Sequence, residues 1–137
     1  MSTRHTLLLA IGLLLAATGA RAETPNDFLA GFAKEAQSAD ANFKGFSAQR
    51  GEQFFKTRHG GEWSCASCHT ERPGQIGRHA VTGKRIDALA PQANAERFTS
   101  RRQVEKWFKR NCNDVLDRAC TAQEKGDVLA YLMTVKP

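Results

Sequence analysis

The chain has 137 residues, a formal net charge of +6 and four cysteines, and 41% of its residues are hydrophobic. This length allows one small domain with a limited apolar core. The basic residues form no long tract, so the sequence argues against nucleic acid as a partner.

Residues 1–22 have the pattern of a secretory signal peptide. Arg4 lies near the start, an apolar run follows over residues 7–17, and Ala20-Arg21-Ala22 is a typical cleavage site. The run is shorter than the roughly 20 apolar residues that a permanent membrane span needs. We therefore expect cleavage after residue 22, which leaves residues 23–137 as a periplasmic domain without a membrane span.

Two helices are expected before the first cysteine. Thr24-Pro25 is typical of an N-cap followed by proline at the first helical position, and the apolar spacing predicts a helix over residues 24–39. Ser47 caps a second helix, over residues 47–57. Its Gly51 would cost about 1 kcal/mol relative to alanine in a helix, so we expect a close helix crossing there.

The clearest chemical signal is the pentapeptide Cys65-Ala66-Ser67-Cys68-His69. C-x-x-C-H attaches c-type haem, because two thiols add to the two vinyl groups of one porphyrin edge and the histidine binds the iron. A thioredoxin-like dithiol would follow a strand, and no strand is predicted before Cys65. A zinc site would need a second, well-spaced ligand pair, and Cys112 and Cys120 are eight residues apart. We predict one covalent haem c on Cys65 and Cys68, with His69 as the proximal iron ligand.

The remaining chain predicts a long loop and two more helices. Glycines and prolines interrupt residues 71–98, which we interpret as an irregular loop held by the haem edge. The capping box Ser100–Gln103 begins a helix that should end near Arg110, and a second box at Thr121–Glu124 begins the last helix. The fold class expected is all-α, with about four helices around one covalently bound haem.

This order of elements resembles the class I cytochromes c. A helix with Gly51 and Phe55 precedes the motif, and the terminal helix carries Leu129, Tyr131 and Leu132. In that fold the first and last helices cross at a glycine and an aromatic residue. Thr82-Gly83 resembles the loop segment whose following residue offers a backbone carbonyl to the haem histidine. The family usually has proline at that next position, where this chain has Lys84, so a hydrogen bond from His69 to the 82–85 region is implied.

A narrower resemblance lies in the C-terminal half of the chain. It is carried by seven segments: Thr82-Gly83-Lys84, Leu89-Ala90-Pro91, Arg97-Phe98-Thr99, Val104-Glu105-Lys106-Trp107, Arg110-Asn111-Cys112-Asn113, Cys120-Thr121 and Glu124-Lys125. These look like the sphaeroides-type haem proteins, an oxygen-binding branch of the class I cytochromes c. In that family the sixth iron ligand is an asparagine, followed directly by a disulfide cysteine. The resemblance therefore implies Asn111 as a distal ligand that leaves on reduction, and a Cys112–Cys120 disulfide.

Other distal ligands remain as alternatives. Met133, the single methionine after the signal peptide, lies in the predicted last helix, where packing is its ordinary role. His79 lies in the loop after the haem motif, and His59 precedes the motif by six residues. Asn113 competes locally with Asn111, which we prefer because it directly precedes Cys112.

The leading hypothesis is a periplasmic cytochrome that binds oxygen, nitric oxide or carbon monoxide after reduction. One alternative is a simple electron carrier whose iron stays six-coordinate, and another is an enzyme that reduces oxygen, peroxide or a nitrogen oxide. The family resemblance implies a dihaem cytochrome c as electron donor. Of the 20 basic and 14 acidic residues, Arg4 and Arg21 leave with the signal peptide, and the remaining net charge of +4 suits an acidic redox partner.

Overall fold

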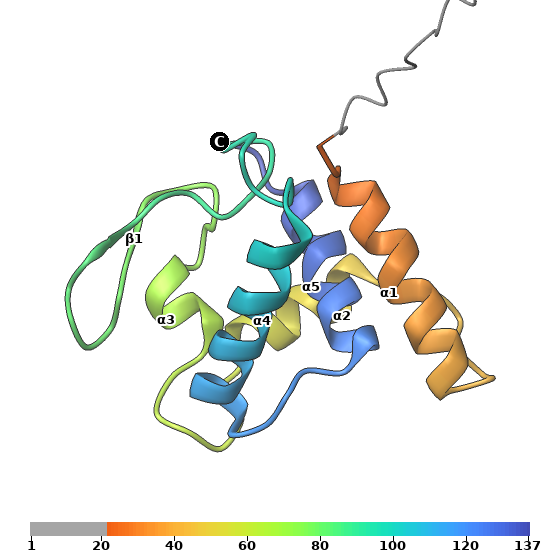
Figure 1. Ribbon diagram of the computed structural model, residues 1–137. Helices are drawn as coiled ribbons and strands as arrows, with labels where there is room; N and C mark the ends of the chain where they lie inside the picture. The colour runs from red at the N-terminus through yellow and green to blue at the C-terminus, as the bar shows by residue number, and fades with distance from the viewer. Residues whose placement is uncertain (1–21) are drawn as a thin grey trace, which may run out of the picture.

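The structure is a computed structural model that describes residues 22–137, so the signal peptide predicted over residues 1–22 lies almost wholly outside the described residues. Five helices and two short strands follow one another along the chain (Figure 1). They are α1 (Pro25–Ala39), α2 (Ala48–Lys56), α3 (Cys65–His69), β1 (Gly77–Arg78), β2 (Arg85–Ile86), α4 (Arg101–Leu116) and α5 (Ala122–Thr134). Within residues 22–137, no helix is both long and apolar enough to span a bilayer. The mostly helical class predicted from the sequence is confirmed.

The N-terminal helix α1 begins where the sequence predicts. The hydroxyl of Thr24 accepts a hydrogen bond from the backbone N–H of Asp27, whose carboxylate in turn accepts one from the backbone N–H of Thr24 at 2.8 Å. This reciprocal pair satisfies two of the otherwise unpaired donors at the helix start. The helix then buries Phe28 and Phe32 against α5, so its apolar stripe faces the core of the domain.

The most extensive helix contact joins α2 and α5, and it forms at the predicted glycine. A Cβ atom at Gly51 would clash with the backbone carbonyl of Asp127 on α5. One turn further along α2, the ring of Phe55 lies 5.6 Å from that of Tyr131. The missing side chain at Gly51 thus allows the two helix backbones to touch, which justifies the cost of a glycine inside a helix.

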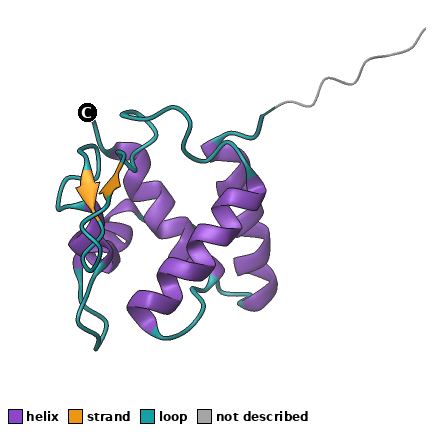
Figure 2. Cartoon of the chain, turned by 60° about the vertical axis from the view of Figure 1, so that its left-hand side comes forward, coloured by secondary structure: helices purple, strands orange, loops and turns teal. Residues whose placement is uncertain are grey.

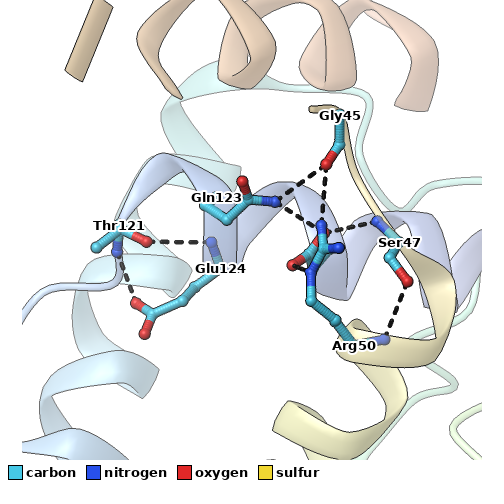
Figure 3. Close-up of polar contacts among 7 residues, drawn as sticks. Gly45, Ser47, Arg50, Thr121, Gln123 and Glu124 are labelled. Carbon is cyan, nitrogen blue, oxygen red and sulfur yellow. Dashed lines mark hydrogen bonds and ion pairs between the residues drawn. The ribbon is translucent and has the colours of Figure 1, made fainter. Parts of the chain in front are cut away.

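A buried carboxylate fixes this crossing. Asp127 is 5% exposed and accepts hydrogen bonds from the backbone N–H of Ser47, from the Arg50 guanidinium and from the Gln123 amide, at 2.7–3.0 Å. Arg50 and Gln123 also donate to the carbonyl of Gly45, as Figure 3 shows. Because a buried charge is stable only when it is paired and hydrogen-bonded, this set of contacts fixes the start of α2 on α5.

Helix α4 begins after Ser100 as predicted, but its end and the capping contact at its start differ from the prediction. It was expected to end near Arg110, but it continues for six further residues to Leu116 and stops at Asp117, which has a left-handed φ of 55°. Ser100 is the N-cap, but its side chain makes no capping bond; the carboxylate of Glu23 instead accepts from the backbone N–H of Arg101. The residues at 104, 108 and 112 keep the helical spacing on the inner side, so the helix has no reason to stop at 110.

The loop predicted over residues 71–98 contains a small hairpin. Strands β1 and β2 pair antiparallel, with Gly77 opposite Ile86 and Arg78 opposite Arg85 (Figure 2). The rest of the segment is held by backbone hydrogen bonds, such as those from the N–H groups of Leu89 and Ala90 to the carbonyl of Pro73. The loop therefore has its own structure and folds back beside α3.

Candidate haem site

The helix α3 consists of the C-x-x-C-H pentapeptide itself. Its start is stabilised by a hydrogen bond of 2.9 Å from the backbone N–H of Ser64 to the hydroxyl of Ser67. One helical turn separates Cys65 from Cys68, and both are free, partly buried thiols. His69 follows as the last residue of the helix. The backbone therefore presents two thiols and one imidazole from a single short element.

The hairpin lies directly against this element. The backbone N–H of Ala80 donates to the sulfur of Cys68 at 3.3 Å. A Cβ atom at Gly77 would clash with the carbonyl of Cys68, so only glycine allows β1 to approach α3 this closely. Residues 77–86 thus cover the Cys68 side of the motif.

Burial controls the protonation of the two motif residues with shifted pKa values. Burial, and to a smaller extent the positive charge of Arg97, lower the pKa of His69 to about 4. Burial also raises the pKa of the Cys65 thiol to about 11. At neutral pH the imidazole is neutral, which is the form that binds a metal.

The two thiols and the imidazole of α3 fit a c-type haem better than a thioredoxin-like dithiol or a zinc site. The ring of Phe55 lies 6.3 Å from that of His69, and Cys65 and Leu89 pack against the apolar cluster that contains Phe55 and Phe98. A porphyrin needs such an apolar wall beside its thiol and imidazole attachments. A helix, α2, precedes the motif where a thioredoxin-like dithiol would have a strand. Within residues 22–137, no group of three or more histidine, cysteine or acidic residues is placed to hold a metal ion.

The carbonyl of Lys84, the position that the resemblance implied as a partner for His69, accepts the backbone N–H of His79 at 2.8 Å and so closes the hairpin. Among the described residues, none makes a hydrogen bond to the ring of His69 in this structure.

The second cysteine pair forms a disulfide. Cys112 lies inside α4 and is 6% exposed, and it is bonded to Cys120, with a Cα–Cα distance of 5.6 Å. The bond ties the C-terminal half of α4 to the segment that starts α5. In the same part of α4, a Cβ at Gly61 would lie 3.5 Å from the carbonyl oxygen of Val115, so α4 also contacts the loop that leads into the haem motif.

The structure separates the two candidate asparagines. Asn111 is half-buried, and its side-chain amide makes no hydrogen bond to any of residues 22–137. Asn113 is exposed and lines an outer surface hollow together with Lys106 and Arg110. Since two residues on a helix are turned by about 200°, the two amides belong to different sides of α4.

The other distal candidates already have partners. The Nδ1 atom of His79 accepts hydrogen bonds from the backbone N–H groups of Val81 and Thr82 at 3.2 and 3.3 Å. His59 donates from Nε2 to the carbonyl of Phe54 at 2.8 Å, and its imidazole packs on the aromatic ring of Phe54. Met133 packs against the apolar cluster at the end of α5.

Arg97 is a residue of this region to which the sequence reasoning gave no role. Its guanidinium donates to the carbonyls of Asp87 and Ala88 at 2.7 and 3.0 Å, which fixes the end of the loop, and its charge acts on His69. The only sequence signal was its place in the Arg97-Phe98-Thr99 segment. A single arginine in an irregular loop gives no indication of which backbone carbonyls it will reach.

Comparison with known proteins agrees with this site. Residues 41–132 match a family model described as "Domain of unknown function (DUF1924)". Cytochrome c'' of Methylophilus methylotrophus is 44% identical over 103 residues, which is 72% of each chain. The cytochrome c-type protein SHP of Cereibacter sphaeroides is 39% identical over 132 residues, which is 93% of this chain and 97% of that protein.

Solved structures of these proteins have the same fold. Oxidized cytochrome c'' from Methylophilus methylotrophus superposes with a TM-score of 0.73 at 38% identity, over 82% of this chain and 95% of that one. Oxidized SHP, described as an oxygen-binding cytochrome c, superposes with a TM-score of 0.71 at 39% identity. The superposition covers 81% of this chain and 96% of that one. Fold and motif together define a haem protein of the class I-like c-type cytochromes. Within that class, the chain belongs to the family of the sphaeroides-type haem proteins.

Proposed function

We propose that this chain is a periplasmic monohaem cytochrome in which Asn111 is a reversible sixth ligand, and that reduction opens the distal site to oxygen or another small diatomic molecule. The haem is attached through Cys65 and Cys68, and His69 is the permanent ligand. A redox partner, for which the family suggests a dihaem cytochrome c, delivers the electron. The observation that carries this proposal is the half-buried, unpartnered amide of Asn111 on the inner side of α4.

The chemistry of an amide explains the proposed switch. When bound, haem iron supplies a one-electron change and an open coordination position for a diatomic ligand. Asn111 offers a neutral, hard and weak donor, which ferric iron accepts and ferrous iron releases in favour of softer ligands. Once released, the side-chain N–H of Asn111 can donate a hydrogen bond to the incoming molecule.

The helical setting of Asn111 restricts this movement to its side chain. Its backbone lies inside α4, and the neighbouring Cys112 is buried and disulfide-bonded. We therefore expect rotamer changes of Asn111, on a fixed backbone, to bind and free the iron. Two relatives support this: SHP is described as an oxygen-binding cytochrome c, and the solution structure of cytochrome c'' is described as bearing on haem-ligand detachment.

The decisive experiment is an absorption spectrum before and after reduction, with and without carbon monoxide. The ferrous protein should be five-coordinate and high-spin, and its spectrum should shift on addition of carbon monoxide. Asn111→Ala should keep the haem but turn ferric iron high-spin or water-ligated. Asn113→Ala is the matched control on the outer side of α4 and should leave both spectra unchanged.

Two results would replace the proposal. A ferrous wild type that stays low-spin and ignores carbon monoxide would indicate a simple electron carrier. Steady-state consumption of oxygen, peroxide or a nitrogen oxide with a reductant would indicate a terminal reductase. If Asn111→Ala left the ferric spectrum unchanged, Asn113 and His79 would be the ligands to test.

A further inference from the structure

The outer side of α4 carries a cluster of cations. Arg102, Lys106, Lys109 and Arg110 are all exposed, and together with Trp107 they form what we call the basic face. Figure 1 shows α4 lying in front of the other helices. Of the two acidic residues in α4, Glu105 is 3.5 Å from Lys125 on α5 and so belongs to the inner side.

Few of these charges are neutralised within the protein. Among residues 22–137, Arg102, Lys106 and Lys109 have no ion pair, and Arg110 has only Asp114 at 3.9 Å. Their positive potential is therefore available to a partner.

The arrangement is unfavourable for the helix itself. Arg102, Lys106 and Arg110 are spaced at i, i+4 and i+8, and each such like-charge pair destabilises a helix by about 0.2–0.5 kcal/mol. The first turn contains Arg102 and no acidic residue, although the positive end of the helix dipole favours acidic residues there. Helix stability therefore does not explain this pattern, which leaves an interaction with another molecule as its physical reason.

An exposed aromatic ring stands at the edge of the basic face, on the side of α4 that carries Asn111 four residues later. Trp107 is 43% exposed. The ammonium of Lys106 and the guanidinium of Arg110 lie 5.3 and 5.8 Å from its ring centroid, so the ring and the two cations hold one another in place. Tryptophan and arginine are enriched where protein interfaces concentrate their binding energy, because a rigid aromatic loses little entropy on docking.

The surface beside the ring is concave. An open hollow of about 410 Å³ is lined by Lys106, Lys109 and Arg110, with Asn113, Asp114 and Ala119 beside them. Its three cations outnumber its one carboxylate, so the hollow is net positive and is suited to carboxylate side chains that project from another protein.

The basic face is directly connected to the proposed ligand. Asn111 follows Arg110 in the chain, about 100° around α4 from it, and is half-buried on the same side as Trp107. The helix is about 10–12 Å across with its side chains, so no more than this width separates the basic face from Asn111. An acidic protein docked on the basic face would therefore lie close enough to the haem site for electron delivery.

We propose that the basic face of α4 is the docking surface for an acidic electron-donor protein, with Trp107 as the apolar anchor at its edge. This inference rests on the proposed function, because it identifies where the redox partner of that cytochrome binds. Complementary charge steers the encounter and raises the association rate by about 10–1,000-fold at low salt.

The test is the rate at which reduced flavodoxin, an acidic one-electron donor, reduces the ferric haem-loaded protein. Lys106→Glu/Lys109→Glu should lower the second-order rate constant about tenfold or more at low ionic strength. The loss should largely disappear near 1 M salt, where the screening length falls to about 3 Å. Trp107→Ala should lower the rate constant at both salt concentrations, because an apolar contact is not screened.

A control variant separates a local surface from overall charge. Lys34→Glu/Lys44→Glu makes the same change in net charge on α1 and the loop after it, where both lysines are exposed and have no ion pair among the described residues. It should change the rate constant by about twofold or less. An equal loss in both variants, or no loss in either, would overturn the proposal.

Two further measurements complete the test. If Lys106→Glu/Lys109→Glu lost binding to phosphatidylglycerol vesicles while its reduction by flavodoxin was unchanged, the basic face would be a lipid-binding surface and the proposal would be wrong. Carbon monoxide binding after dithionite reduction should be normal in every variant. A wild type without such binding would contradict the proposed function alone, since the donor rates are measured independently of gas binding.

Discussion

Helices α5 and α4 are similar in length and opposite in how they are held. α5 has 13 residues, of which six are buried, and it contacts both α1 and α2 extensively. α4 has 16 residues, of which only Val104 and Cys112 are buried. The sequence of α5 is therefore largely determined by packing, whereas most positions of α4 are free for other purposes. This difference explains why both the proposed ligand and the proposed docking surface lie on α4.

A few separate anchors hold α4 in place. At its start Arg101 pairs with Glu23 at 2.6 Å, in its middle the ring of Phe108 lies 5.8 Å from that of Phe32, and near its end Cys112 forms the disulfide. Isolated anchors leave the helix turns between them less stable than a continuous apolar seam does. The described contacts thus predict that α4 depends on the haem more than α5 does.

Removal of the haem attachment should have the largest effect on the protein, and it tests directly whether α4 depends on the haem more than α5 does. Cys65→Ala/Cys68→Ala should abolish covalent haem completely, which intact mass of protein matured with haem-attachment machinery will report. In the haem-free protein, backbone amides of α4 should exchange with solvent much faster, while those of α5 stay protected by the α1 and α2 contacts. Wild-type protein with a mass equal to residues 23–137 alone would contradict the attachment, and equal exchange in α4 and α5 would contradict the comparison.

The sequence predicted best those elements whose signals are local. The reciprocal cap at Thr24 and the glycine crossing at Gly51 need only neighbouring residues or a known helix cost, and both were located correctly. The end of α4 was missed because asparagine and cysteine at 111–113 are weak helix formers. Tertiary contacts through Cys112 outweigh this local preference.

Contacts between distant segments were not predictable. Asp127 was not singled out, although a charged residue inside the apolar stripe of the last helix is a signal for a buried pair. Its partners Ser47 and Arg50 are about 80 residues away in sequence, and nothing local identifies them. The two-residue strands at residues 77–78 and 85–86 are too short to have a periodicity of their own.

Loss of the disulfide should have the next largest effect. The two cysteines are eight residues apart, and the chain-entropy model gives roughly 2–3 kcal/mol for a closed loop of this size. Cys112→Ala/Cys120→Ala should lower the free energy of unfolding by this amount, and the faster amide exchange should be confined to the C-terminal half of α4. Thiol labelling of the denatured, unreduced wild type should find no reactive thiol; two labelled thiols would remove the basis of this prediction.

A side chain at position 51, where α2 crosses α5, tests the claim that α5 is held by tight packing. Gly51→Ala places a Cβ against the backbone carbonyl of Asp127, which cannot move without separating α2 from α5, so we expect a loss of about 1–3 kcal/mol in denaturant unfolding. Gly31→Ala is the matched control inside α1, where the nearest atom is the flexible Arg101 side chain at 3.8 Å. That variant should be neutral or gain up to about 1 kcal/mol. Equal effects at both glycines would mean that the crossing is not tightly packed.

The smallest expected effect concerns the start of α5. Glu124 closes the capping box by accepting from the backbone N–H of Thr121 at 2.8 Å, and both carboxylate oxygens accept from Arg118 at 2.6 and 2.8 Å. Burial alone would raise the pKa of Glu124, but these hydrogen bonds outweigh it and hold the pKa below its ordinary value. The carboxylate therefore stabilises the folded state above the unfolded pKa of about 4.3, and this contribution is lost as the pH falls through the lower folded value.

Glu124→Gln tests this pH-dependent contribution to stability, and the lowered pKa of Glu124 determines the direction of the expected change. Near pH 6 the variant should be less stable than wild type by about 0.5–1 kcal/mol, the usual value of a helix cap, and the difference should shrink as the pH is lowered toward 3. Glu35→Gln, at an exposed position of α1 with no ion pair among the described residues, should produce no such pH-dependent difference. A penalty for Glu124→Gln that stayed constant across this range would mean that the amide loses only packing or geometry. The charge of Glu124 would then contribute nothing to holding the first turn of α5, and the firm placement of that helix would rest on its buried face alone.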